Sequence, residues 1–272
     1  MFGWERSRLS RVTNTLTAYL FDRWKHLLRW DAERLTPTQL SQYAQAVQRA
    51  GSPLSNCCGF LDGTMREVAR PVQNQRILFN GWKRHHALKF HSLITPDGMH
   101  IHVYGPVEGR RHDETIFQSS GLQNLLSKYL WSPNGKPLVI YADSAYGLSQ
   151  HLLSPFQSSV GQAGLSQEEK KWNYQMSRVR ESVEWSFGNL VRTWPAIDGK
   201  HNKVLLTPIG IQYLVAVLLT NARNIMQPGQ VSQFFSCAPP SLSEYFHGLP
   251  SEEDEEAWDM RALAGPLYEE CD

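Results

Sequence analysis

Two short apolar runs, each followed by an aspartate, constrain the fold of this chain more than any other feature. The run at 57–61 precedes Asp62, and the run at 138–142 precedes Asp143. The second run is short and rich in β-branched residues, which is typical of a buried strand. If the two strands are neighbours, their aspartates lie side by side at one edge of a sheet. A lone aspartate at a strand end is more often a turn residue or a helix cap, so this pattern alone leaves both interpretations open.

The remaining patterns place these strands in an α/β fold, with a mixed sheet flanked by helices. Pro96-Asp97-Gly98 is a turn signal between two strand-like segments and predicts a hairpin. Asp113 is expected to cap the helix that follows this hairpin. The expected elements are strands at 57–61, 87–95, 99–104 and 138–142, helices at about 114–129, 176–194 and 209–226, and a connection at 147–175 with one short strand or helix.

The α/β domain is expected to have a helical segment before it and an extension after it. Leucine and valine recur at helical spacing between 9 and 20, and Thr36-Pro37 is typical of a helix N-cap and first helical residue. Pro239-Pro240 and the acidic run at 252–256 indicate a partly ordered extension. We therefore expect an N-terminal helical segment at 1–54, the α/β domain at 55–228 and a C-terminal extension with an acidic tail at 229–272.

The charge of the chain is unevenly distributed. Its net charge is +1, but residues 251–272 hold nine acidic residues and one basic residue, Arg261, so residues 1–250 carry a net charge of +9. A basic body suits a polyanionic partner, because phosphate contacts by Lys and Arg release counterions. A mildly basic body with a solvated acidic tail explains the same numbers, and charge alone does not decide between these readings.

Several classes of protein are disfavoured by what the sequence lacks. No apolar run reaches the ~20 residues of a membrane-spanning helix, and the first residues lack the charged-then-apolar order of a secretory signal. Four cysteines, two of them adjacent and none in a C-x-x-C pair, give neither a disulfide framework nor a zinc signature. This usage favours a reducing intracellular compartment. The chain also has no H-E-x-x-H pair, glycine-rich phosphate loop or nucleophile elbow.

A third carboxylate follows from the periodicity of the helix expected at 176–194. At about 100° per residue, its apolar residues fall within about 40° of Val183 and form a narrow stripe. Glu184 lies at about 100°, on the flank of the stripe, and can reach the edge of the helix–sheet interface. Glu181 lies at about 160° and is expected to point to water. Taken alone, Glu184 is better explained as a boundary residue paired with Arg180, four residues earlier.

Five ordered segments carry a resemblance to a known family. They are GFLDGT, NGWKRHHALKF, PDGMHIHVYGPVEGRRHDETIF, YADSAYGL and MSRVRESVEWSFGNL. In this order they are similar to the DDE transposases of the PIF/Harbinger group, and the similarity runs from about Phe2 to Leu249. Within these motifs, Asp62 falls on the aspartate of D-G-T, Asp143 on that of D-S-A-Y and Glu184 on the glutamate of V-E-W-x-F-G.

The resemblance implies an RNase H-like fold for residues 55–228 and a metal-dependent endonuclease that cuts and joins DNA phosphodiesters. Asp62, Asp143 and Glu184 would be both the catalytic and the metal-binding residues of a two-metal DDE mechanism, with Mg²⁺ or Mn²⁺. The resemblance further implies transposon ends and target DNA as substrates, a Myb-like DNA-binding partner protein and location in the nucleus. It leaves homo-oligomerisation open. Members of the group carry more N-terminal sequence, so we expect this chain to be truncated or diverged there.

Two basic clusters are candidates for holding the DNA backbone near the metal ions. They are Lys83, Arg84, His85 and Lys89, at the entrance to the second strand, and Arg110 with Arg111. A solvated face explains each residue equally well, although the resemblance favours a functional role for the turn at 83–86. Trp82 and Trp185 are candidates for stacking on unpaired bases, whereas packing in the core is the commoner fate of tryptophan.

Two rival functions stay open. A catalytically idle, transposase-derived protein that binds DNA or partner proteins is disfavoured by the presence of all three carboxylates, and favoured by the expected N-terminal loss. A cellular nuclease acting on RNA or hybrids is disfavoured by the family resemblance. Comparing cleavage of DNA, RNA and hybrid substrates separates the second rival from a transposase.

Overall fold

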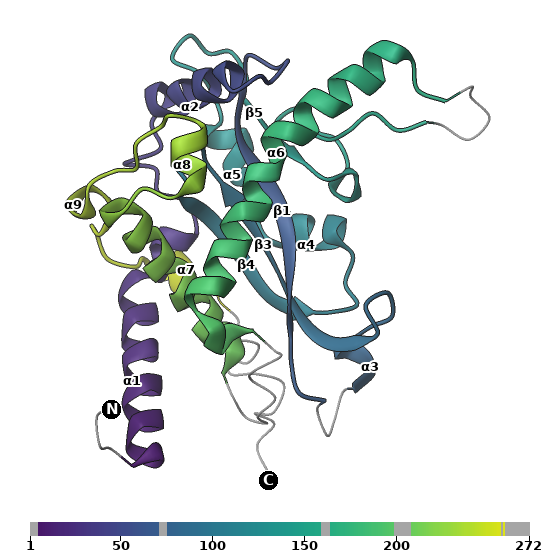
Figure 1. The fold of residues 1–272 in the computed structure, drawn as a ribbon. Helices are drawn as coiled ribbons and strands as arrows, with labels where there is room; N and C mark the ends of the chain where they lie inside the picture. Colours follow the sequence, from purple (N-terminus) through teal and green to yellow (C-terminus); the bar gives the residue numbers. More distant parts are fainter. Residues whose placement is uncertain (1–4, 71–74, 159–163, 199–207, 257, 259–272) are drawn as a thin grey trace.

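The computed structural model describes residues 5–70, 75–158, 164–198, 208–256 and 258. The strands of these residues are β1 (Cys57–Glu67), β2 (Phe79–Asn80), β3 (His85–Ile94), β4 (His100–Glu108), β5 (Val139–Ala142) and β6 (Leu152–Leu153). They form one mixed sheet in which β2, β3, β1, β5 and β6 follow one another and β4 pairs with β3 (Figure 1). β1 is antiparallel to β3 and parallel to β5, so it lies at the centre of the sheet.

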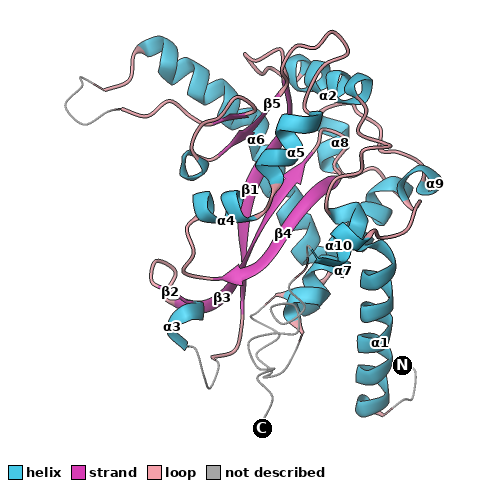
Figure 2. Ribbon diagram, turned by 180° about the vertical axis from the view of Figure 1, so that it is seen from behind, coloured by secondary structure: helices cyan, strands magenta, loops and turns pink. Residues whose placement is uncertain are grey.

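Helices cover both faces of this sheet. They are α1 (Arg6–Trp24), α2 (Pro37–Arg49), α3 (Gln75–Leu78), α4 (Asp113–Ser119), α5 (Leu122–Tyr129), α6 (Gln167–Thr193), α7 (Ile209–Met226), α8 (Gln230–Phe234), α9 (Leu242–Tyr245) and α10 (Glu252–Glu256). α6 crosses one face, and α4 and α5 lie on the other, as the two opposite views show (Figure 1, Figure 2). This is the mixed α/β architecture that the sequence predicts, and it is consistent with an RNase H-like fold. No described helix combines the length and the apolar character needed to span a bilayer.

The core has two layers, one on each face of the sheet, because side chains alternate along a strand. Phe60 of β1 and Tyr141 of β5 pack in the layer beneath α6, together with Val179 and other apolar residues of that helix. Leu61 and Ile140, the sequence neighbours of these two aromatic residues, pack in the opposite layer with residues of α5 and α7. Residues two apart on β1 or β5 therefore face the same helices.

β1 is longer than its apolar run predicts. The sequence predicts an end at Leu61, but the strand continues to Glu67, so Asp62 lies within it. The reason is that β1 has two partners of different length. Its parallel pairing with β5 stops at Leu61, whereas its antiparallel pairing with β3 continues to Glu67. The apolar run marks the buried half of the strand, and the hydrogen-bonded ladder extends beyond it.

The helix predicted at about 114–129 is divided into α4 and α5. Gly121, between them, adopts a left-handed backbone with φ of +71°, which an α-helix cannot contain. The prediction that Asp113 caps this helix is wrong. His112 holds the N-cap position without a side-chain hydrogen bond, and Asp113 is the first helical residue. The carboxylate of Asp113 binds Lys89 instead of the backbone at the start of the helix.

α6 begins at Gln167, well before the predicted start at Met176. Ser166 and Glu169 form a capping box, in which each side chain accepts a hydrogen bond from the backbone N–H of the other residue. The first turns of α6 are polar because they extend past the sheet, and this is why apolar periodicity does not detect them. The rest of the connection contains β6, the one short strand that was expected.

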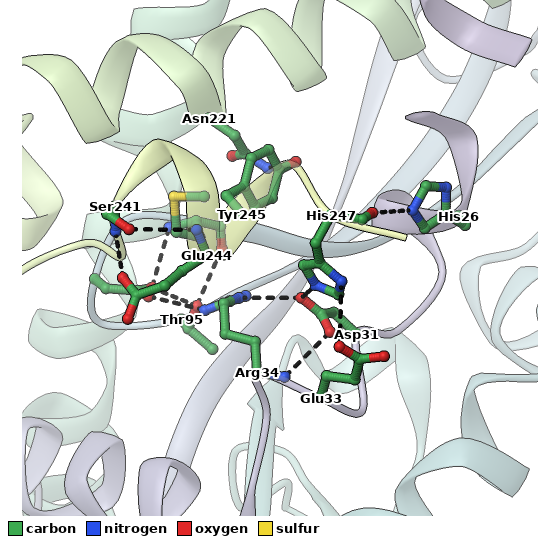
Figure 3. A network of polar contacts seen from close by, with 12 residues as sticks. His26, Asp31, Glu33, Arg34, Thr95, Asn221, Ser241, Glu244, Tyr245 and His247 are labelled. Carbon is green, nitrogen blue, oxygen red and sulfur yellow. Dashed lines mark hydrogen bonds and ion pairs between the residues drawn. The ribbon is translucent and has the colours of Figure 1, made fainter. Parts of the chain in front are cut away.

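The segments expected to flank the domain are bound to it and to each other. His247 Nε2 lies 3.0 Å from Asp31 Oδ2, and Asp31 also pairs with Arg34 (Figure 3). Arg34 pairs at 3.3 Å with Asp97, which accepts a further hydrogen bond from the Tyr43 hydroxyl. Asp97 belongs to the β3–β4 turn, which falls where the sequence predicts. The turn is therefore bound to the N-terminal segment, which also binds the C-terminal segment, and the boundaries at 54 and 228 stay predictions.

Candidate active site

Asp62 and Asp143 occupy corresponding positions along two neighbouring parallel strands, Asp62 within β1 and Asp143 just after β5. Leu61 pairs with Ala142 in the register of β1 and β5, and the two aspartates are the next residues of their chains. Asp143 follows the last residue of β5 and is exposed, whereas Asp62 is half-buried within β1. Parallel pairing thus brings together two carboxylates that are far apart in the sequence.

Asp62 projects toward α6, and the alternation of side chains along a strand places Asp143 on the same face of the sheet. Asp62 is two residues after Phe60, and Asp143 is two residues after Tyr141, so each shares the face of the aromatic residue that packs beneath this helix. Arg180 of α6 lies accordingly above the sheet at this point. Its Nη1 atom is 3.4 Å from Asp62 Oδ2. The site is therefore a small acidic surface between the middle of the sheet and the middle of α6.

Asp62 holds its proton more tightly than an ordinary aspartate. Burial raises its pKa to about 6, against the opposing effects of the Arg180 charge and of the Gly63 N–H. The negative charges of Asp143 and Glu184 raise it further. The Gly63 N–H donates to Asp62 Oδ1 at 2.9 Å, which fixes the orientation of the carboxylate. Burial beside like charges disfavours the ionised form, and a bound cation reverses this effect.

Glu184 lies at the rim of this site. Its apolar neighbours on α6 are buried as the helical periodicity predicts, and its charge acts on Asp62. Its side chain is exposed, as is that of Glu181, and both border a hollow of about 380 Å³ between α6, α7 and α8. Among the residues that the structure describes, no three His, Cys, Asp or Glu side chains form a group close enough to hold a metal ion. The structure thus brings two of the three predicted carboxylates together and leaves the third nearby.

A buried chain of hydrogen bonds connects α6 to the sheet. Ser92, the β3 partner of Asp62, has its Oγ 2.7 Å from His100 Nδ1, and His100 Nε2 is 2.8 Å from Ser186 Oγ of α6. Burial lowers the pKa of His100 to about 3, so the ring is neutral and has one donor and one acceptor nitrogen. One hydroxyl therefore donates to the ring and the other accepts from it.

Gly63 faces the opposite layer, where a side chain would be crowded. A Cβ atom there would lie 3.1 Å from Tyr146 Oη and 3.5 Å from Asp113 Oδ1. The Tyr146 hydroxyl is buried and has no hydrogen-bond partner among the described residues. Burial and the charges of nearby aspartates, Asp113 first, raise the pKa of Tyr146 well above its ordinary value. Asp113 itself binds Lys89 Nζ at 3.1 Å, so a second polar cluster supports β1 from below.

The first basic cluster is divided by the structure. Lys83 and Arg84 are exposed in the turn between β2 and β3, and His85 is half-buried where β3 begins. Lys89 lies further along β3, and its ammonium contacts the Arg111 carbonyl at 2.8 Å as well as Asp113. Lys89 is thus occupied inside the protein, whereas the turn is open to a partner.

The second basic cluster is divided in the same way. Arg110 is exposed, whereas Arg111 forms an ion pair with Glu108 at 2.8 Å. The two tryptophans considered for base stacking also separate. Trp185 is half-buried and packs edge-on against Phe234 of α8, but Trp82 is 89% exposed in the β2–β3 turn.

Comparison with known protein families decides what kind of domain carries this site. The family model described as DDE superfamily endonuclease matches residues 61–221, which make up more than half of the chain and contain all three predicted carboxylates. The chain belongs to the DDE superfamily endonucleases. The DDE resemblance of the ordered motifs is thereby confirmed, while the presence of catalysis and of metal dependence stays to be tested.

Two relatives extend this assignment of a DDE endonuclease domain. The chain is 24% identical over 210 residues to Protein ALP1-like of Arabidopsis thaliana, covering 73% of this chain and 48% of that protein. It is 30% identical over 128 residues to the probable transposase for insertion sequence element IS702 of Microchaete diplosiphon, covering 46% of this chain and 42% of that protein. The chain thus spans about half the length of the curated relatives it matches. No solved structure matches it significantly.

Sequence reasoning missed the position of Arg180 in this DDE endonuclease domain. It paired Arg180 with Glu184 along the helix, but the guanidinium reaches across to Asp62. The helical angle contains the signal, since Arg180 lies at about 60° from Val183, on the same flank as Glu184. Tyr146 was missed as well. Its contact with Gly63 joins two motifs, D-G-T and D-S-A-Y, and no pattern within either motif indicates it.

Proposed function

We propose that this DDE endonuclease domain cuts and joins DNA phosphodiesters with divalent metal ions held by Asp62, Asp143 and Glu184. The observation that carries the proposal is the register of β1 and β5, which sets the two aspartates on adjacent strands facing α6. The effect of Glu184 on the pKa of Asp62 supports its membership of the same site. The transposase relative supports DNA as the substrate.

The donor set fits Mg²⁺ or Mn²⁺. Both ions prefer carboxylate oxygens, and a half-buried aspartate beside further negative charge is a place that a cation stabilises. When bound, the ions would activate the attacking water or DNA 3′-hydroxyl and stabilise the leaving oxygen. No covalent intermediate with the protein is needed in such an in-line displacement.

The protein's own groups prepare the site in three ways. The Gly63 N–H and the Ser144 hydroxyl each donate to one oxygen of the neighbouring aspartate, at 2.9 Å and 3.0 Å, and so fix the two carboxylates. Arg180 balances the charge of Asp62 when no cation does. Its guanidinium can exchange this carboxylate for a DNA phosphate, because each offers a pair of oxygen acceptors that suits its fork of donors.

The test is nicking of supercoiled plasmid in Mn²⁺, Mg²⁺ or EDTA, with the Asp143→Asn variant as the matched control. This variant keeps the shape of the side chain and removes its charge. We expect nicking that requires metal and is absent in the variant. Nicking that continues in EDTA or in Asp143→Asn would show that another centre cuts the DNA. A folded wild-type protein that binds DNA and never nicks it would sink the proposed activity.

A second candidate function is DNA or protein binding without cleavage. The observation that favours it is the ion pair of Arg180 with Asp62, because the guanidinium occupies a carboxylate that a metal ion would need. Glu184 is exposed at the rim of the site instead of pointing into it with the aspartates. In that case Mn²⁺ should leave the thermal unfolding temperature unchanged. A rise in this temperature with Mn²⁺ that Asp62→Asn abolishes would favour the enzyme.

The resemblance to the PIF/Harbinger group supports a nuclear location and a Myb-like DNA-binding partner, which we propose on that basis alone. Tagged protein that stays outside the nucleus, or that co-purifies with no DNA-binding protein, would contradict these two proposals. Homo-oligomerisation is tested separately by the mass of the purified protein in light scattering.

A further inference from the structure

The β2–β3 turn presents an aromatic side chain to solvent. Trp82 is 89% exposed, which is the highest exposure of any large hydrophobic residue in the described part of the chain. Trp185, the other tryptophan considered for base stacking, is packed against Phe234. Exposing a tryptophan is costly in water, so a turn that holds one outward is suited to a partner with a flat apolar surface.

The turn is held rigidly on the body of the protein. The side chain of Asn80 is buried and donates to the Gly109 carbonyl at 2.6 Å, while its Oδ1 accepts the Lys83 N–H at 2.8 Å. The Asn80 carbonyl accepts the Arg84 N–H at 2.8 Å, and Arg84 closes the turn with a left-handed φ of +58°. Gly109 fits closely here, since a Cβ atom would lie 2.6 Å from the Ala87 carbonyl. Trp82 is therefore presented on a fixed backbone.

Exposed cationic residues accompany Trp82 in and beside the turn. Lys83 and Arg84 follow Trp82 in the turn and are exposed, and the turn at 81–84 contains no acidic residue. Arg110 is exposed beside the Gly109 carbonyl that holds Asn80. An aromatic ring among cations is the combination that binds single-stranded nucleic acid, because bases stack on the ring while phosphates contact the cations. An apolar protein surface would not use these charges.

The turn lies at a defined separation from the proposed active site. Asp62 pairs with Ser92 of β3, and Asn80 pairs with His85, seven residues earlier on the same strand. At about 3.3 Å per residue this is about 23 Å along the strand. A duplex that rises 3.4 Å per base pair covers the same length in about seven base pairs. The turn is thus outside the proposed metal site, and a DNA duplex that followed the direction of β3 would pass both.

We propose that Trp82 is a base-stacking residue that binds unpaired bases of the DNA about seven nucleotides from the cleaved bond, with Lys83, Arg84 and Arg110 on the flanking phosphates. This inference rests on the proposed function for the identity of the nucleic acid as DNA. It adds a preference for strands that are open or distorted on one side of the cut. The preference would come from stacking and would tolerate any base, since every base has a flat face.

The test compares binding to two DNA duplexes of equal length, one fully paired and one with a short single-stranded gap carrying 2-aminopurine. EDTA is present throughout, so that no cleavage occurs and binding is measured apart from catalysis. Trp82→Ala should lower the preference for the gapped duplex by roughly 5- to 150-fold, the range expected for one stacked base. It should also remove the quenching of 2-aminopurine fluorescence, and Trp82→Phe should retain most of both effects.

Tyr19→Ala is the matched control, because Tyr19 is a 63% exposed aromatic residue on α1, far from the turn (Figure 1). It should bind both duplexes as the wild type does. Equal binding of the two duplexes by the wild type, or an unchanged preference in Trp82→Ala, overturns the proposal. Absence of plasmid nicking in Mn²⁺ would instead count against the proposed function alone, because the gap preference is measured without metal.

Discussion

The guanidinium of Arg180 lies 3.4 Å from the carboxylate of Asp62, so α6 provides a positive charge to the first aspartate of the site. Both side chains are about four-fifths buried, at 21% and 19% exposure, and solvent screens the pair only in part. This relationship makes the proposed metal site a place where two cations compete. Four predictions follow from it and from the packing around it.

Removing the competitor should make the protein more dependent on metal. We expect Arg180→Gln to lower the thermal unfolding temperature in EDTA by about 2–4 °C, corresponding to about 1 kcal/mol, because Asp62 loses its partner. The stabilisation by Mn²⁺ should then be larger than in the wild type. Arg178→Gln changes an exposed arginine of the same helix and should behave as the wild type does. A smaller Mn²⁺ effect in Arg180→Gln would mean that the arginine helps to hold the metal.

The two exposed glutamates of α6 should differ in their effect on cleavage. We expect Glu184→Gln to lower metal-dependent nicking by at least about 100-fold, since even the partners of metal ligands contribute about 10- to 100-fold. Glu181→Gln should stay within a few-fold of the wild type, because the pKa of Asp62 responds to Glu184 and not to Glu181. Rates of plasmid relaxation in Mn²⁺ measure both. An inactive Glu181→Gln with an active Glu184→Gln would reverse the assignment.

A methyl group on Gly63 should strain the site through Tyr146. The added Cβ would lie 3.1 Å from Tyr146 Oη, so we expect Gly63→Ala to destabilise the protein by about 1–3 kcal/mol and to impair nicking. Tyr146→Phe removes the hydroxyl in question, which has no hydrogen-bond partner among the described residues, so its loss breaks no hydrogen bond there. The double variant should therefore recover most of the urea midpoint lost by Gly63→Ala. Additive effects of the two changes would place the strain elsewhere.

The protein should lose stability in mild acid because of buried histidines. Burial lowers the pKa of His91 and His100 to about 3 and that of His102 well below its ordinary value. The folded state keeps these rings neutral, whereas the unfolded chain protonates them near pH 6.5. The free energy of unfolding is therefore not reduced by these rings above pH 6.5, and it decreases as the pH falls from 6.5 toward 3. Together the three rings lower the free energy of unfolding by about 4 kcal/mol at pH 5.5. Asp62, with its pKa raised to about 6, opposes this trend by up to one proton.

Urea unfolding at pH 7.5 and pH 5.5 measures this dependence. His91→Met replaces a buried ring whose two nitrogens have no partner among the described residues, and it should make the pH dependence shallower by about one proton. His112→Gln, which changes an exposed histidine, is the control variant. Equal stability of the wild type at the two pH values would show that these histidines titrate normally.

The pattern of apolar residues determined the α/β class and the order of the main strands and helices, and Pro96-Asp97-Gly98 determined the position of the β3–β4 turn. It also determined which face of α6 is buried, since the stripe around Val183 is the face that packs on the sheet. These features depend on local periodicity, because a strand repeats every second residue and a helix every third or fourth. The ordered motifs added the family, which the family comparison confirms.

The tertiary structure alone decided how far β1 extends and what each polar group contacts. β1 continues past Leu61 because β3 is long enough to pair with it, and no local pattern contains the length of a partner strand. Asp97 has the sequence of an ordinary turn residue, yet it is buried by Arg34 and Tyr43 from another part of the chain. Arg180 pairs with Asp62 instead of Glu184 for the same reason. Which charged groups form an ion pair depends on which of them lie close together in the folded protein. Their proximity results from the packing of the helices on the sheet and is not visible in a local sequence pattern.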